Sequence, residues 1–171
     1  REKEPKMISL NLNIRGGRDM KKYKVGYTTG VFDLFHIGHL NILRRAKEYC
    51  EYLIVGVSTD ELVLSYKKKT PIIPFEERVR IVEAIRYVDR VVPQTNRDKK
   101  QALMKYKFDV MFVGSDWRGT PMWVSLEEEF SSLGVEIVYF PYTQGTSSTL
   151  LASVLHRIYS DEAAISLDRG E

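Results

Sequence analysis

Short apolar segments typical of strands alternate with segments of helical periodicity along most of this chain. The strand patterns cover residues 25–29, 52–58, 90–93, 109–113 and 135–140. Apolar residues at helical spacing fill the intervals, over about 40–50, 75–85, 98–107 and 123–133, and again over 148–159. Strands and helices in this order form right-handed βαβ units. The pattern therefore predicts an α/β fold: an open, mostly parallel, doubly wound (Rossmann-like) sheet of about five strands, with helices on both faces.

The 171 residues are enough for one domain with a substantial core. Residues 1–22 are polar, and we interpret them as an N-terminal extension or a segment added during cloning, although Met7–Ile14 alternates like a strand. Residues 23–160 form the predicted domain. Residues 161–171 are acidic and rich in small residues, which is typical of a frayed C-terminal tail.

The composition excludes several classes of protein. With 43% hydrophobic and 29% charged residues the chain is neither disordered nor collagen-like, and a net charge of +3 is too small to indicate a nucleic-acid partner. The one cysteine, Cys50, excludes an internal disulfide and favours a reducing compartment. No apolar run reaches the roughly 18 residues that a membrane span needs, so we expect no membrane partner.

The loop after the first predicted strand holds two of the three histidines, His36 and His39. Ligands of doubly wound sheets bind beyond the carboxyl ends of the strands, and phosphates bind where the next helix begins. Two imidazoles three residues apart can converge there on one anion, and Gly38 lets a ligand approach the backbone. A lone histidine would more often cap the helix or pack. A metal site is the rival use of the pair, but we predict no protein metal ligands.

The sequence His36-Ile37-Gly38-His39 resembles the HxGH signature of the nucleotidyltransferase superfamily. Together with Gly30–His39, three further segments make the chain similar to the cytidylyltransferases, and among them to the glycerol-3-phosphate enzymes: Leu43–Lys47, Val57–Glu61 and Ile85–Asp89. The resemblance covers roughly residues 23–155. It implies that residues 23–160 are a nucleotidyltransferase domain.

The resemblance also implies roles for individual residues. The catalytic residues would be His36, His39, Lys68 and Arg86. Contacts to CTP would come from the loops after the first, fourth and fifth strands, through Val31, Phe32, Gly38, Asp116, Trp117, Tyr142, Thr143, Gly145, Thr146, Ser147, Ser148 and Thr149. The acceptor would contact Asp33, Lys67 and Lys100.

The chain departs from the family pattern at several of these positions. Tyr66 stands where the family has a second lysine, for which Lys67 is the candidate replacement, and Arg97 stands where the glycerol-phosphate enzymes have tryptophan. Tyr142 occupies an arginine position and cannot supply its charge, so Arg118 and Arg15 are the candidates to replace it.

These observations predict an enzyme that moves CMP from CTP to a phospho-alcohol. Glycerol 3-phosphate is the expected acceptor, giving CDP-glycerol, a donor for cell-surface polymers, and pyrophosphate. Mg²⁺ should accompany CTP, and the resemblance implies a cytoplasmic homodimer. Two alternatives stay open. One is a cytidylyl- or adenylyltransferase for another acceptor, such as phosphocholine, phosphoethanolamine or a sugar-alcohol phosphate. The other is a non-catalytic nucleotide-binding module.

Overall fold

The computed structural model describes the backbone of residues 21–168 and the side chains of residues 21–160. The alternating segment Met7–Ile14 and most of the predicted extension lie outside the described residues. The domain begins with a strand at Tyr23, one residue after the predicted extension ends.

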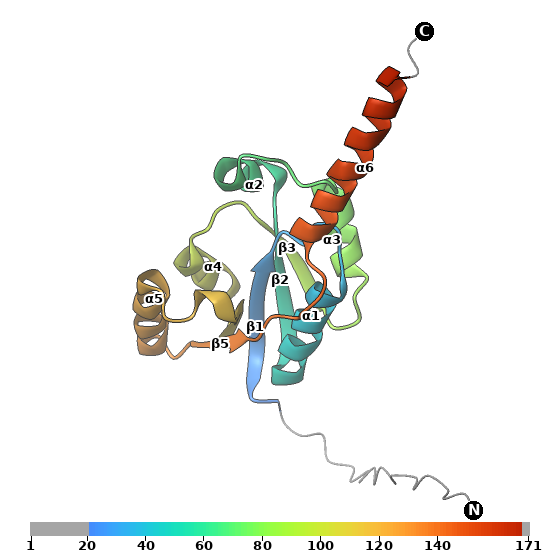
Figure 1. Cartoon of the computed structure of the whole chain (residues 1–171). Coiled ribbons are helices and arrows are strands. Elements are labelled where there is room, and N and C mark those ends of the chain that lie inside the picture. Colours follow the sequence, from blue (N-terminus) through green and yellow to red (C-terminus); the bar gives the residue numbers. More distant parts are fainter. Residues whose placement is uncertain (1–20, 169–171) are drawn as a thin grey trace, which may run out of the picture.

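The described residues form one five-stranded sheet in which every neighbouring pair is parallel. Its spatial order is β3-β2-β1-β4-β5 (Figure 1). The strands are β1 (Tyr23–Gly30), β2 (Cys50–Ser58), β3 (Arg90–Gln94), β4 (Val110–Gly114) and β5 (Glu136–Phe140). The predicted α/β architecture is confirmed, and residues 53–57 of β2 form a buried apolar run, as expected for a strand that is covered on both faces.

Helices cover both faces of this sheet, as predicted. Helices α1 (Ile37–Tyr49) and α3 (Phe75–Glu83) pack on one face around Leu43 and Val82. On the other face, α4 (Lys99–Tyr106) and α5 (Pro121–Ser132) pack around Tyr27 and Phe130. No helix among the described residues is long and apolar enough to span a bilayer.

Two helices differ from the sequence prediction. Helix α2 (Asp60–Lys67) was not predicted, because it spans only eight residues and buries only Leu62 and Val63. Helix α6 (Ser148–Asp168) continues nine residues beyond the predicted end at Tyr159. Figure 1 shows that α6 projects away from the sheet, with its N-terminus near the strand ends.

The order of the strands reverses between β1 and β4, which are neighbours in space but not in the chain. From β1 the chain crosses over to β2 on one side, and later returns to β4 on the other. In sheets of this topology the loops that leave two such strands diverge, and a crevice opens between them at the carboxyl edge. The fold therefore places the loop with His36 and His39 beside the loops after β4 and β5.

Candidate active site

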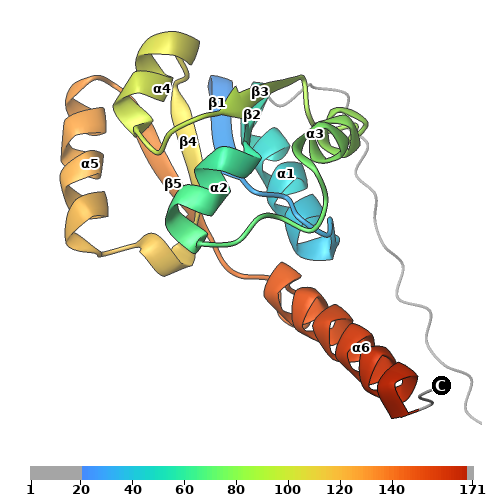
Figure 2. The same ribbon diagram turned by 90° about the horizontal axis from the view of Figure 1, so that it is seen from above.

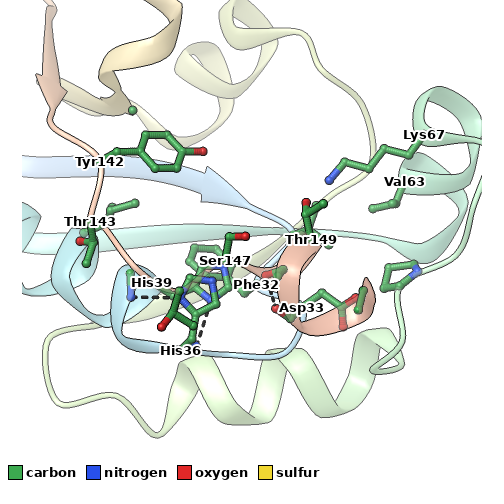
Figure 3. Close-up of a pocket in the computed structure, with 18 of the residues that line it drawn as sticks. Phe32, Asp33, His36, His39, Val63, Lys67, Tyr142, Thr143, Ser147 and Thr149 are labelled. Carbon is green, nitrogen blue, oxygen red and sulfur yellow. Dashed lines mark hydrogen bonds between the residues drawn. The ribbon is translucent and has the colours of Figure 1, made fainter. Parts of the chain in front are cut away.

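A cavity of about 350 Å³ lies at this edge of the sheet. The loop after β1, the N-termini of α1 and α6, and the end of α2 enclose it (Figure 3). Most of the predicted site residues line it: Val31, Phe32, Asp33, His36, Gly38, His39, Lys67, Trp117, Tyr142, Thr143, Thr146, Ser147, Ser148 and Thr149. The topology thus brings together residues separated by more than one hundred positions in the chain.

The two histidines lie side by side on this cavity, with ring centroids 4.0 Å apart. His36 is the N-cap of α1, and its Nδ1 accepts a hydrogen bond of 3.0 Å from the backbone N–H of Gly38. The Nδ1 of His39 accepts a bond of 3.3 Å from the backbone N–H of His36. This reciprocal capping holds both rings in fixed orientations before any ligand binds.

The same hydrogen bonds determine where each ring carries its proton. A neutral imidazole has one N–H, so a ring whose Nδ1 accepts a bond carries its proton on Nε2. Burial lowers the pKa of His36. Burial and the neighbouring His36 lower the pKa of His39 to about 4. At neutral pH the cavity is therefore lined by two uncharged rings whose Nε2–H groups are free to donate to an oxyanion.

Gly38 is required by the position of the His36 ring. A Cβ at residue 38 would lie 2.7 Å from Cε1 and 3.0 Å from Nδ1 of His36, which is closer than carbon atoms can approach. Any side chain there would push the imidazole out of its capped position. The glycine of the motif thus has a steric role besides the access to backbone that its sequence position suggested.

The loop between β1 and α1 has a strained backbone. Phe32 and Leu34 have positive φ angles of 55° and 47°, a conformation that costs energy for residues other than glycine. The carboxylate of Asp33 holds the loop, because it accepts bonds from the backbone N–H groups of Ile72 at 2.8 Å and Ile73 at 2.9 Å. Asp33 thus fixes the loop at the border of the cavity, and its contact to the acceptor stays a prediction.

Arg78, which the sequence analysis did not single out, is fully buried behind this loop. Its guanidinium donates to the carbonyl oxygens of Val31, Ser58 and Ile73 and pairs with Asp60 at 2.6 Å. It thereby joins the ends of β1 and β2 to the segment before α3. A buried arginine requires such complete pairing, since an unpaired charge would be costly.

The hydroxyl-bearing residues at the start of α6, from Thr146 to Thr149, differ in whether their hydroxyls make hydrogen bonds within the protein. The hydroxyl of Ser147 accepts a bond of 3.1 Å from the backbone N–H of Leu150, and that of Ser148 donates to the carbonyl of Asp33 at 2.6 Å. Among the residues that the structure describes, the hydroxyls of Thr146 and Thr149 make no such bond, although both residues line the cavity. The N-termini of α1 and α6 both reach the cavity, and each favours an anion there.

The lysine run after α2 is arranged differently from the prediction. Lys67 and Lys69 line the cavity, whereas Lys68 does not. Lys68 caps α2 in the left-handed conformation, with φ 58°, and its Nζ donates to the carbonyl of Ser65 at 2.9 Å. The left-handed cap turns this residue away from the ligand space. The lysines on the cavity wall are therefore Lys67 and Lys69, and the catalytic role of Lys68 stays a prediction.

Four more of the predicted residues do not line the cavity. Arg86 lies in the turn that follows α3. Lys100 points from α4 towards α5, where it pairs with Glu129 at 2.6 Å. Asp116 is exposed beside Trp117, and Gly145, with φ 104°, serves as a turn.

Of the two candidate replacements for the missing arginine, Arg118 is described by the structure and does not line the cavity. The guanidinium of Arg118 lies 5.7 Å from the ring centroid of Tyr139, and Arg15 lies outside the described residues. Tyr142 itself lines the cavity, with 65% of its surface exposed.

Within the described part of the chain, no three histidine, cysteine or acidic side chains cluster so that they could hold a metal ion.

Comparison with known proteins identifies this arrangement. Residues 27–166 match the family model described as cytidylyltransferase-like. The chain belongs to this family. The glycerol-3-phosphate cytidylyltransferase of Bacillus subtilis (strain 168) is 42% identical over 123 residues, which are 71% of this chain and 89% of that protein. The enzyme of the same name from Staphylococcus aureus is 38% identical over 130 residues, 75% of this chain and 92% of that one.

Other relatives of this cytidylyltransferase-like chain have different names. The FAD synthase of Pyrococcus abyssi is 36% identical over 132 residues, 75% of this chain and 88% of that protein. A solved structure of a lipopolysaccharide core biosynthesis protein from Thermoplasma volcanium covers 72% of this chain, with 99% of its own chain aligned. Its TM-score is 0.59 at 23% identity, so it supports the fold alone.

Proposed function

We propose that this protein transfers CMP from CTP to a phospho-alcohol, with glycerol 3-phosphate as the first candidate, and releases pyrophosphate. The observation that carries the proposal is the pair of neutral imidazoles held by backbone bonds at the carboxyl edge of β1. The identity of about 40% to glycerol-3-phosphate cytidylyltransferases, over nearly their whole length, supports the choice of substrates. The product would be CDP-glycerol.

The chemistry needs no nucleophile from the protein. An oxygen of the acceptor's phosphate attacks the α-phosphorus of CTP and forms the new P–O bond. The bond from the α-phosphorus to the oxygen that bridges to the β-phosphate breaks, and its electron pair leaves with pyrophosphate. Catalysis then consists of positioning the two substrates and stabilising the charge that develops on the phosphoryl oxygens.

Each part of the cavity has a role in this reaction. The Nε2–H groups of His36 and His39 donate to oxygens of the reacting phosphates. Lys67 and Lys69 provide positive charge from the end of α2, and the N-terminus of α6 binds the outer phosphates through backbone N–H groups and the Thr149 hydroxyl. Trp117 and Tyr142 provide apolar walls for the base and ribose.

Mg²⁺ would bind with CTP and neutralise part of the triphosphate charge. The described side chains offer no cluster of metal ligands, which fits an ion held mainly by the phosphate oxygens of the nucleotide. We also propose that the protein acts in the cytoplasm, where CTP is available, and that it forms a homodimer, which light scattering can test.

The decisive experiment is pyrophosphate release with CTP or ATP and a panel of acceptors: glycerol 3-phosphate, phosphocholine, phosphoethanolamine and ribitol 5-phosphate. We expect release with CTP and glycerol 3-phosphate, and none from the His36→Ala/His39→Ala double variant. Release with ATP instead would favour an adenylyltransferase, the class to which the FAD synthase relatives direct attention. Binding of CTP without release for any acceptor would indicate a non-catalytic module.

A further inference from the structure

Among the described residues, one side-chain hydrogen bond joins helix α1 to the loop between β5 and α6. The amide N–H of Asn41 donates to Oγ1 of Thr143 over 3.2 Å, although the two residues lie 102 positions apart in the chain. Asn41 lies in α1, two residues after His39. Thr143 lines the cavity, and Figure 3 draws it on the side away from Lys67. The bond therefore connects the helix that carries the histidine pair to a second wall of the cavity.

The loop over residues 141–147 has few other attachments. It contains no helix or strand, and Figure 2 shows that the helix it leads into, α6, stands clear of the sheet. In the described part of the chain, one further side-chain bond reaches this region from outside it, between the hydroxyl of Ser148 and the carbonyl oxygen of Asp33. Residues 141, 142, 144 and 145 are exposed, whereas Thr143 is half-buried. Asn41 thus holds the one half-buried residue of an otherwise exposed stretch.

The direction of this bond determines what the Thr143 hydroxyl can do. A hydroxyl has one proton to donate and lone pairs that accept. Because the amide N–H of Asn41 donates to Oγ1, the bond leaves the hydroxyl proton unused, and no other described group accepts it. The proton is therefore available to an acceptor atom of a ligand in the cavity.

Thr143 also lies close to the histidine pair. A Cβ at Gly38 would lie 3.8 Å from Cβ of Thr143 and 2.7 Å from Cε1 of His36, so these two side-chain atoms are no more than about 6.5 Å apart. That separation lets one phosphate group contact both side chains. The Thr143 hydroxyl and the imidazole of His36 can therefore act on the same anion.

Resting on the proposed function, we propose that Asn41 is a positioning residue for the nucleotide. Its amide holds the oxygen of the Thr143 hydroxyl towards α1 and leaves the proton to donate to a phosphate oxygen of CTP. Asn41 does not itself line the cavity, so it acts through Thr143. A hydrogen bond to a charged group contributes more than one between neutral groups, so loss of the oriented hydroxyl should be measurable in the affinity for CTP.

A double-mutant cycle on kcat/KM for CTP tests this, because residues that act through one bond have non-additive effects. We expect Thr143→Val and Asn41→Leu each to lower kcat/KM by about tenfold, mainly through KM. In a Thr143→Val background, Asn41→Leu should have no further effect. Asn41→Ala takes its place if Asn41→Leu folds poorly.

Two further variants serve as controls. Thr143→Ser keeps the hydroxyl and should retain most of the activity. Gln144→Leu removes an exposed amide next to Thr143 that does not line the cavity, so it should leave kcat/KM as it is.

Asn41→Asp tests the direction of the bond. A carboxylate can only accept, so it would take the hydroxyl proton of Thr143 away from the ligand. We expect kcat/KM for CTP to fall at least as far as in Asn41→Leu. The fall should be larger than the one that Asn41→Asp causes in the Thr143→Val background, where only repulsion by the added charge remains. Wild-type activity of Asn41→Asp would overturn the proposal.

Calorimetric titration with CTP and Mg²⁺, measured beside pyrophosphate release, separates this inference from the proposed function. If the protein binds CTP but releases no pyrophosphate with any acceptor, the proposed function is wrong, and the same cycle on the Kd for CTP then supports or overturns the role of Asn41. If the wild type turns over and the effects of Asn41→Leu and Thr143→Val are additive, the proposed function stands and this inference is overturned. If CTP does not bind at all, both are wrong.

Discussion

The two sides of the cavity hold their polar groups in opposite ways. On the α1 side, the rings of His36 and His39 are fixed by backbone hydrogen bonds and lie 4.0 Å apart. On the α2 side, Lys67 and Lys69 belong to an exposed segment, and within the described residues neither pairs with a carboxylate. Fixed neutral donors need no reorganisation when charge develops, whereas flexible cations can close over the phosphates after they bind.

The largest effect should come from removing a fixed donor. His36→Ala and His39→Ala should each reduce kcat by about 100-fold or more, since each removes a preorganised hydrogen-bond donor to a charged oxygen. Steady-state pyrophosphate release measures this, and circular dichroism checks the fold. A variant that keeps nearly normal turnover would show that its histidine only caps α1.

A smaller effect should follow from displacing a ring without removing it. In Gly38→Ala the added Cβ would lie 2.7 Å from the His36 ring, so the imidazole must move, and we expect kcat to fall by about tenfold or more. Ile37→Ala is the control, because the Ile37 side chain is 51% exposed beside the same glycine. Equal turnover in Gly38→Ala and the wild type would mean that the ring position is not critical.

On the α2 side of the cavity, the effects of substitutions on kcat/KM should be smaller again and should depend on which lysine is changed. Lys67→Ala and Lys69→Ala should each lower kcat/KM for CTP by about tenfold, and Lys68→Ala by less, because its Nζ donates to its own helix at Ser65. The same assay at a series of CTP concentrations separates kcat from KM. If Lys68→Ala has the largest effect, this loop moves on binding and the sequence-based assignment is right.

The smallest effect concerns stability and pH. Unfolded His39 binds a proton near pH 6.5, whereas its folded pKa is about 4, so the unfolded state binds more protons between these values. The free energy of unfolding should therefore fall as the pH decreases from 6.5 towards 4, and be unaffected by this group above 7. Urea unfolding measures it. His39→Asn should have a shallower slope than the wild type, and identical slopes would contradict the assigned burial.

Sequence patterns predicted the fold, and the structure places His36 and His39 together at the edge of the sheet where the sequence put them, because both features depend on local order. Residues 53–57 of β2 are apolar and buried, as expected for a strand that is covered on both faces, and His36 and His39 lie where α1 begins, after the loop that follows β1. The sequence did not indicate which lysines line the cavity. Helix α2 is too short for its periodicity to show, and its left-handed cap at Lys68 decides which neighbours face the cavity.

Arg78 and Arg86 also show that a sequence pattern does not determine where a side chain lies when packing between distant segments decides it. Both lie in the segment that leads into β3, and a pattern match favoured Arg86. It is Arg78 whose guanidinium reaches the loop after β1, at the carbonyl oxygen of Val31, whereas Arg86 lies in the turn after α3 and does not line the cavity. Lys99 and Lys100 are adjacent in α4, yet one reaches Thr29 of the sheet and the other pairs with Glu129 on the surface. Neighbours in a helix differ by about 100° in direction, so packing decides their roles.

The sequence alone determined that this chain forms a parallel α/β sheet with two histidines at the start of its first helix. These features follow from hydrophobic periodicity and from residues close together in the chain. Only the tertiary structure decided which cations face the ligand, because that depends on caps, helix directions and packing between segments far apart in the sequence. It also buried Arg78 behind the loop after β1, where one side chain joins three separate segments.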